Sequence, residues 1–121
     1  MAATNPGCAS ALHEVLKTHL SGRHITAIMG MMADKDSMRY LELTAPHFER
    51  IITVRPQNPR SLSAEALADE AKHFCKDVQP AQSMKDAIEK ATVSGDEVLV
   101  ICGSFFLASE IRDLAIEKYK A

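Results

Sequence analysis

The 121-residue chain is long enough for one compact domain with a hydrophobic core, since 46% of its residues are apolar. Its 16 acidic and 14 basic residues nearly balance, which excludes the broad basic surface that binding to nucleic acids or anionic membranes requires. The three cysteines lack metal-ligand spacing, and no apolar run approaches the roughly 20 residues of a membrane span. These observations predict a single cytoplasmic domain over residues 1–121.

The first half of the chain alternates helical and strand patterns. Apolar residues at helical spacing predict a helix over about 7–20. A run of apolar and β-branched residues at 24–30 is typical of a strand that is buried on both faces. A short amphipathic helix should follow, with Asp36 as its N-cap, and should end before Pro46.

The second half continues the alternation after a loop that contains two prolines. In chain order it predicts a strand at 50–54, the loop at 55–62, a helix from its cap Ser63 to about Cys75, a short strand at Val78, a helix capped by Ser83, a turn at 94–96, a strand at 97–102 and a last helix through Leu107, Ile111 and Leu114.

The element order α(βα)4 predicts the fold class. Strands separated by helices of this length pair in parallel through right-handed crossovers, so we expect an α/β, Rossmann-like three-layer sandwich with a mostly parallel sheet. One feature is unusual: the chain opens on a helix start at Asn5-Pro6, and the strand that would normally feed such a helix is absent from the pattern.

Polar side chains follow the predicted strands. Because the carboxyl ends of parallel strands meet at one edge of a sheet, these side chains should line a common crevice. A mixture of cations, carboxylates and small polar groups suits a ligand with both anionic and ammonium groups, such as an amino acid, or a nucleotide phosphate. The alternative is that Asp36 and Ser104 only cap helices while Lys35 is solvated. The candidates are Asn5, Asp34, Lys35, Asp36, Arg60 and Ser104.

The short motifs that are present or absent limit which kinds of ligand site the chain can form. Gly103-Ser104 directly after a buried strand resembles an anion cradle made of backbone N–H groups. Neither GxxxxGK[ST] nor GxGxxG occurs, so no motif in this chain binds a triphosphate in the P-loop manner, and a dinucleotide oxidoreductase is disfavoured. No serine or cysteine lies in a recognisable nucleophile setting and the histidines lack ligand spacing, so no catalytic or metal-binding residue is assigned.

Three motifs together resemble the C-terminal domain of the folylpolyglutamate synthase and dihydrofolate synthase family, within the Mur ligase superfamily. They are MGMMADKD at 29–36, NPRSLSAEAL at 58–67 and VLVICGSFFLASEIR at 98–112. The resemblance implies an enzyme that uses ATP and Mg²⁺ to convert a folate or dihydropteroate carboxylate into an acyl phosphate, which the amine of L-glutamate attacks. It also implies a larger N-terminal ATPase domain with the P-loop and the metal site, over which this chain, as an excised or truncated C-terminal domain, would close.

Two positions depart from the D-x-A-H-N-P pattern of that family. Met1 stands at its aspartate and Thr4 at its histidine, and a threonine can donate a hydrogen bond but cannot carry charge. The six candidate residues do fall on matching motif positions, which implies that they face substrate or nucleotide. Without the P-loop and metal site, the chain alone should be catalytically inert.

The alternative, from a different class, is a free-standing α/β signalling or ligand-binding module. A phospho-receiver is its obvious version. Such a protein would need an acidic pair near the end of its first strand and a phosphorylatable aspartate after its third. The chain has Asp34 and Asp36 after one strand but only Val78 to Ala81 at the other.

Overall fold

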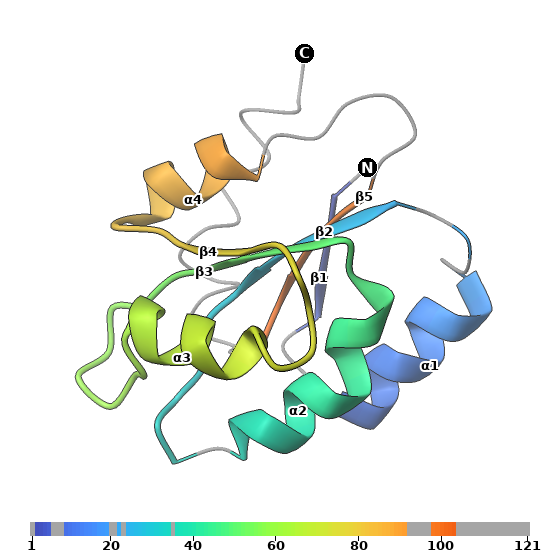
Figure 1. The fold of residues 1–121 in the computed structure, drawn as a ribbon, viewed down its shortest axis with the longest axis horizontal. Coiled ribbons are helices and arrows are strands. Elements are labelled where there is room, and N and C mark those ends of the chain that lie inside the picture. Colours follow the sequence, from blue (N-terminus) through green and yellow to red (C-terminus); the bar gives the residue numbers. More distant parts are fainter. Residues whose placement is uncertain are drawn as a thin grey trace.

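The computed structural model describes residues 2–5, 9–19, 22, 24–34, 36–91 and 98–103, with the backbone alone at 2–5 and 9–10. Figure 1 shows a central sheet with helices on both faces. The elements are β1 (Ala2–Asn5), α1 (Ala9–His19), β2 (Ile25–Met29), α2 (Ser37–Thr44), the 3-10 helix η1 (Ala45–His47), β3 (Arg50–Thr53), α3 (Ala64–Ala71), β4 (Val78–Pro80), α4 (Met84–Lys90) and β5 (Val98–Cys102).

The sheet has five strands in the order β1-β5-β2-β3-β4, and each neighbouring pair is parallel. In its centre, Ile28 of β2 lies opposite Ile101 of β5 on one side and Ile52 of β3 on the other. The α/β fold with a parallel sheet is therefore confirmed.

The expected absence of a first strand was wrong. Ala2–Asn5 form β1, which pairs with Leu99–Cys102 at the edge of the sheet. The sequence Ala-Ala-Thr-Asn has no alternation and no run of β-branched residues, because backbone hydrogen bonds to β5 define this strand rather than its side chains. The described chain thus begins on a strand, while the predicted last helix and the turn at 94–96 lie outside the described residues.

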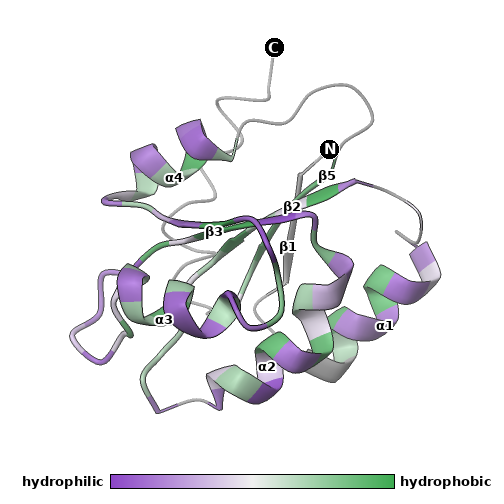
Figure 2. Ribbon diagram, in the orientation of Figure 1, coloured by the Kyte–Doolittle hydropathy of each residue, from purple (hydrophilic) through white to green (hydrophobic). Residues whose placement is uncertain are grey.

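Two apolar layers hold the helices on the sheet. In Figure 1, α1, α2 and α3 lie on one face and α4 lies on the other. Alternate residues of β5 explain this arrangement: Val98, Val100 and Cys102 belong to the core under α1 to α3, whereas Leu99 and Ile101 belong to the core under α4. All residues of β5 are buried, as predicted for a strand covered on both faces, and Figure 2 shows this strand in the apolar colour.

Side-chain caps start three of the helices as the sequence predicts. Oxygens of Asp36, Ser63 and Ser83 accept hydrogen bonds from backbone N–H groups one turn into α2, α3 and α4, at 3.1, 3.1 and 3.0 Å. Helix α2 ends before Pro46, again as predicted, although the chain continues through one 3-10 turn that contains this proline. None of the described helices is long and apolar enough to cross a membrane.

Candidate functional site

The loops after β2 and β3 are tied together at the carboxyl edge of the sheet. Backbone N–H of Ala33 donates to the carbonyl of Arg60 at 2.7 Å, and that of Leu62 donates to the carbonyl of Met31 at 2.9 Å. Met32 and Ser61 form an antiparallel bridge between these contacts. The two charged loops therefore form one surface, as predicted from the parallel sheet.

An ion pair joins two of the six candidate residues across these loops. The Arg60 Nη2 to Asp34 Oδ2 distance is 2.5 Å, and the two side chains are 69% and 55% exposed. An exposed pair of this kind contributes only about 0–1 kcal/mol to stability. Its main structural effect is to hold a guanidinium and a carboxylate side by side in solvent, where both retain capacity for a ligand.

The other four candidate residues are not part of this ion pair in the structure as described. The Asp36 carboxylate accepts a hydrogen bond from the backbone N–H of Arg39 through Oδ1, so it caps α2 as predicted. Asn5 ends β1 opposite Cys102 of β5, at the same sheet edge, and its backbone is the part described. Lys35 and Ser104 lie outside the described residues.

The ends of β2 and β5 approach each other backbone to backbone. Gly30 N–H donates to the carbonyl of Cys102 at 3.3 Å, and Gly103 has a φ of +100°. A Cβ at position 103 would collide with the carbonyl oxygen of Gly30. Both the backbone conformation and the available space therefore require glycine at the start of the predicted anion cradle.

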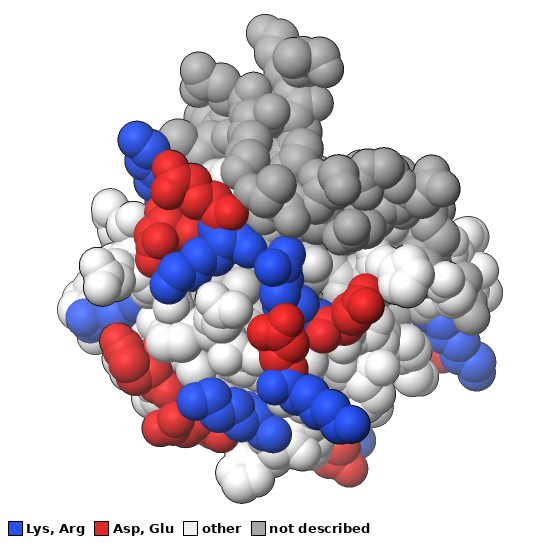
Figure 3. Space-filling view, turned by 45° about the horizontal axis from the view of Figure 1, so that its top comes forward, with Lys and Arg blue, Asp and Glu red and all other residues white. Residues whose placement is uncertain are grey.

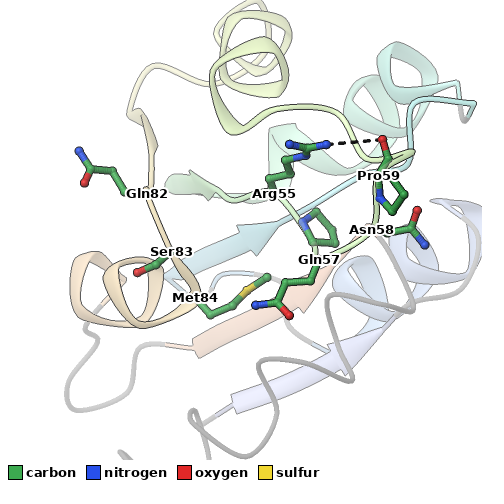
Figure 4. Close-up of a pocket in the computed structure, with 8 residues that line it drawn as sticks. Arg55, Gln57, Asn58, Pro59, Gln82, Ser83 and Met84 are labelled. Carbon is green, nitrogen blue, oxygen red and sulfur yellow. Dashed lines mark hydrogen bonds between the residues drawn. The ribbon is translucent and has the colours of Figure 1, made fainter.

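A pocket that the sequence did not predict lies between the ends of β3 and β4 (Figure 4). These neighbouring strands lead into α3 and α4 on opposite faces of the sheet, and such a switch opens a crevice at the carboxyl ends of the strands. The pocket has a volume of about 470 Å³. Its described lining consists of Arg55, Pro56, Gln57, Asn58, Pro59, Gln82, Ser83 and Met84.

The sequence carried a partial signal for this pocket. The two prolines and two arginines of the loop at 55–62 directly follow a strand, which is a typical position for a ligand-binding loop. What the sequence could not show is that the chain crosses to the other face of the sheet after β4. That crossing brings Gln82 to Met84 beside the β3 loop.

Neither described thiol is set up as a nucleophile. Complete burial raises the pKa of Cys102 to about 12, despite a hydrogen bond with Tyr40 that acts in the opposite direction. Burial also raises the pKa of Cys75. Within the described ranges, no three His, Cys, Asp or Glu side chains lie together as metal ligands, so the geometry assigns no metal site to them.

Charges are mixed on the face of the molecule that lies over these loops and strands in Figure 3. Figure 3 shows acidic and basic side chains interspersed over the face that it presents. This pattern agrees with the near balance of charge in the sequence, and the described residues on this face form no extended patch of one sign.

The fold and these loops define a domain of the Mur ligase class. Residues 2–105 match the family described as "Mur ligase, glutamate ligase domain", and the chain belongs to that family. Its sequence is 33% identical over 130 aligned positions to the dihydrofolate synthase/folylpolyglutamate synthase of Mycobacterium tuberculosis, covering 93% of this chain and 27% of that protein.

Solved structures give the same grouping. The folylpolyglutamate synthase of M. tuberculosis complexed with ADP superimposes with a TM-score of 0.82 at 28% identity, over 92% of this chain and 29% of that one. The Thermotoga maritima folylpolyglutamate synthase superimposes with a TM-score of 0.74 at 28% identity, over 91% of this chain and 25% of that one. Escherichia coli FolC in complex with DHPP and ADP superimposes with a TM-score of 0.81, over 97% of this chain and 28% of that one. Its sequence identity is 19%, so this match supports the fold alone.

The chain thus corresponds to between a quarter and a third of the length of each of these relatives. The comparisons favour the ligase hypothesis over the signalling-module alternative, because the family match begins at β1 and includes the first two motifs and residues 98–105 of the third, in order.

Proposed function

We propose that this chain is the C-terminal domain of an ATP-dependent ligase that adds L-glutamate to the carboxylate of a folate or a dihydropteroate. The observation that carries the proposal is the family match over residues 2–105, which includes the two loops joined by the Asp34–Arg60 pair. The reaction would pass through an acyl phosphate. The ATP, the Mg²⁺ and the folate would be held mainly by an N-terminal ATPase domain, and this domain would close over them.

In this proposal the loops after β2 and β3 contribute to holding glutamate. Free glutamate carries an ammonium group between carboxylates, and the exposed pair presents one charge of each sign. Guanidinium groups bind carboxylates through paired hydrogen bonds, so Arg60 would take a carboxylate while Asp34 attracts the ammonium group. Asn5, Lys35, Asp36 and Ser104 are proposed to face substrate or nucleotide through the family resemblance.

The metal ion is assigned to the proposed N-terminal domain. When bound, Mg²⁺ supplies charge neutralisation on the transferring phosphoryl group. The described residues offer no set of ligands for it, so no step in this domain is assigned to the metal. The contribution of the chain is to bind, orient and exclude water, and the chain alone is expected to have no ligase activity.

A chimera tests the proposal. This chain would replace the corresponding domain of the M. tuberculosis enzyme, and ATP-dependent incorporation of labelled L-glutamate into tetrahydrofolate and dihydropteroate would be measured. We expect the chimera to be active, Arg60→Ala to lose most activity, and the exposed Arg39→Gln to retain it. A folded, ATP-binding chimera without ligation, or ligation by the isolated chain, would refute the proposal.

A further inference from the structure

We propose that His13 and His47 form a binding site for a divalent transition-metal ion that takes neighbouring nitrogen ligands at right angles, such as Ni²⁺ or Cu²⁺. The pair joins α1 to η1, on the face of the sheet that α1, α2 and α3 cover (Figure 1). The fold brings together two residues that are 34 positions apart in the chain. They belong neither to the Asp34–Arg60 pair nor to the pocket lining, so the site is independent of the proposed ligase reaction.

Both imidazoles are attached to backbone that packing holds in place. His13 directly follows Leu12, which is buried in the core under α1. His47 ends η1 between Ala45 and Phe48, which are buried in the same core. The backbone N–H of Phe48 also donates to the carbonyl of Ala45 at 3.0 Å. Little ordering is therefore needed when an ion binds, which lowers the entropic cost of binding.

The distance between the two nitrogens fits one class of metal geometry. Nδ1 of His13 lies 2.9 Å from Nε2 of His47, and the ring planes are tilted by 55°. Two nitrogens at this distance, each about 2.0–2.1 Å from the same ion, subtend an angle of about 90° at that ion. A tetrahedral ion such as Zn²⁺ would need them about 3.3 Å apart. The geometry therefore favours an ion with square-planar or octahedral coordination.

The two rings can supply their lone pairs without releasing a proton. Burial, and then the charge of His13, lower the pKa of His47 from 6.5, so the His47 ring is neutral at pH 7.5. Without an ion, the facing nitrogens share one hydrogen bond, and one of them carries the proton. When the ion binds beside the line that joins these nitrogens, that proton moves to the other nitrogen of its own ring. Each ring then has one N–H and one metal bond.

A second histidine pair in the described part of the chain is less suited to holding an ion. Nδ1 of His24 lies 2.9 Å from Oε2 of Glu49, but the two side chains are 74% and 62% exposed. Holding two exposed side chains in one geometry costs conformational entropy. His13 and His47 are half-buried. No third His, Cys, Asp or Glu joins a metal-binding group among the described residues, so water would complete the coordination of the ion.

The test is a titration of the intact, untagged chain with NiCl₂ at pH 7.5, followed by calorimetry and by broadening of backbone amide resonances. We expect one ion per chain, with residues 12–14 and 45–48 broadened first. His13→Gln and His47→Gln should each weaken binding roughly 100-fold, because two linked contacts exceed one by about that factor or more. His73→Gln removes an exposed histidine and serves as the matched control, for which we expect no change.

Several outcomes would overturn the proposal. They are the absence of broadening at millimolar Ni²⁺, broadening centred on other residues, and an affinity unchanged in a folded variant of either histidine of the pair. An equal loss of affinity in His73→Gln would also overturn it, as would tighter binding of Zn²⁺ than of Ni²⁺, which would contradict the right-angled geometry. Circular dichroism checks the folding of each variant. Because the site needs both rings, one folded variant of the two is enough to decide the result.

Discussion

Replacing Gly103 by alanine should destabilise the domain much more than the same change at Gly22. Both glycines have positive φ angles, +100° and +79°, and a left-handed backbone costs a residue with a Cβ about 1–2 kcal/mol. Alanine also restricts the unfolded chain, which offsets about 0.4–1 kcal/mol of that cost. At Gly22 nothing lies within 4 Å of the added Cβ, so Gly22→Ala should cost at most about 1.5 kcal/mol.

At Gly103 the Cβ meets a second obstacle. It would collide with the carbonyl oxygen of Gly30 and lie 3.2 Å from Cγ of Met29. The backbone must shift to accommodate it, because Gly30 is held by its hydrogen bond to Cys102, and overpacking of this kind costs about 1–3 kcal/mol more. We therefore expect Gly103→Ala to lower the free energy of unfolding by about 2–4 kcal/mol in total.

Urea denaturation followed by circular dichroism measures both changes. With a slope of about 2 kcal/mol per molar urea, the middle of the usual range, Gly103→Ala should lower the midpoint by about 1–2 M, and Gly22→Ala by less than about 1 M. If the two variants lost stability equally, the close approach of β2 and β5 would not be a rigid feature of the fold, and the reasoning about Gly103 would be wrong.

Three further outcomes are expected. Burial, and then the charge of His13, whose Nδ1 lies 2.9 Å from Nε2 of His47, lower the pKa of His47 from 6.5. As the pH falls through 6.5, the unfolded chain therefore binds more protons than the folded domain does. The free energy of unfolding in urea should thus fall from pH 7.5 toward pH 5, and His47→Gln should flatten that fall. Iodoacetamide at pH 8, read by peptide mass spectrometry, should leave Cys102 unmodified until urea unfolds the domain, since burial raises its pKa to about 12. Arg60→Ala should lower the free energy of unfolding by less than about 1 kcal/mol, and a loss above 2 kcal/mol would show that its pair with Asp34 is structural.

The sequence predicted those features that depend on local chemistry or on strong periodicity. The apolar runs of β2 and β5 are buried at every position, and the caps Asp36, Ser63 and Ser83 start the helices expected of them. A continuous apolar run needs cover on both faces wherever it lies, and a capping oxygen acts within one turn. Both signals are therefore readable without knowledge of the rest of the fold.

Features that depend on partners distant in sequence were predicted incompletely. Strand β1 was missed because a four-residue edge strand with small side chains has no period to detect. Asp34 and Arg60 were placed at the same edge, but their pairing depends on the bridge between Met32 and Ser61. Long-range pairing of this kind is encoded in the sheet topology and not in either loop alone.

The loop at 55–62 links the two candidate sites, because its arginines serve different surfaces. Arg60 pairs with Asp34 of the β2 loop, whereas Arg55 lines the pocket beside α4. Between them, Asn58 makes three hydrogen bonds: its N–H donates to Pro56 at 2.8 Å, its carbonyl accepts from Ser61 at 3.0 Å, and its side chain accepts from Arg60 at 2.9 Å.

These bonds, together with two prolines that have fixed φ angles, hold the loop in one shape before any ligand arrives. A side chain that organises the turn positions both arginines at once. We therefore expect Asn58→Ala to weaken L-glutamate binding near Arg60, read from the backbone amide shifts of residues 60–62 during a glutamate titration. Arg55→Gln, on the other side of the loop, should leave that binding unchanged, and an equal loss in both variants would contradict the reasoning.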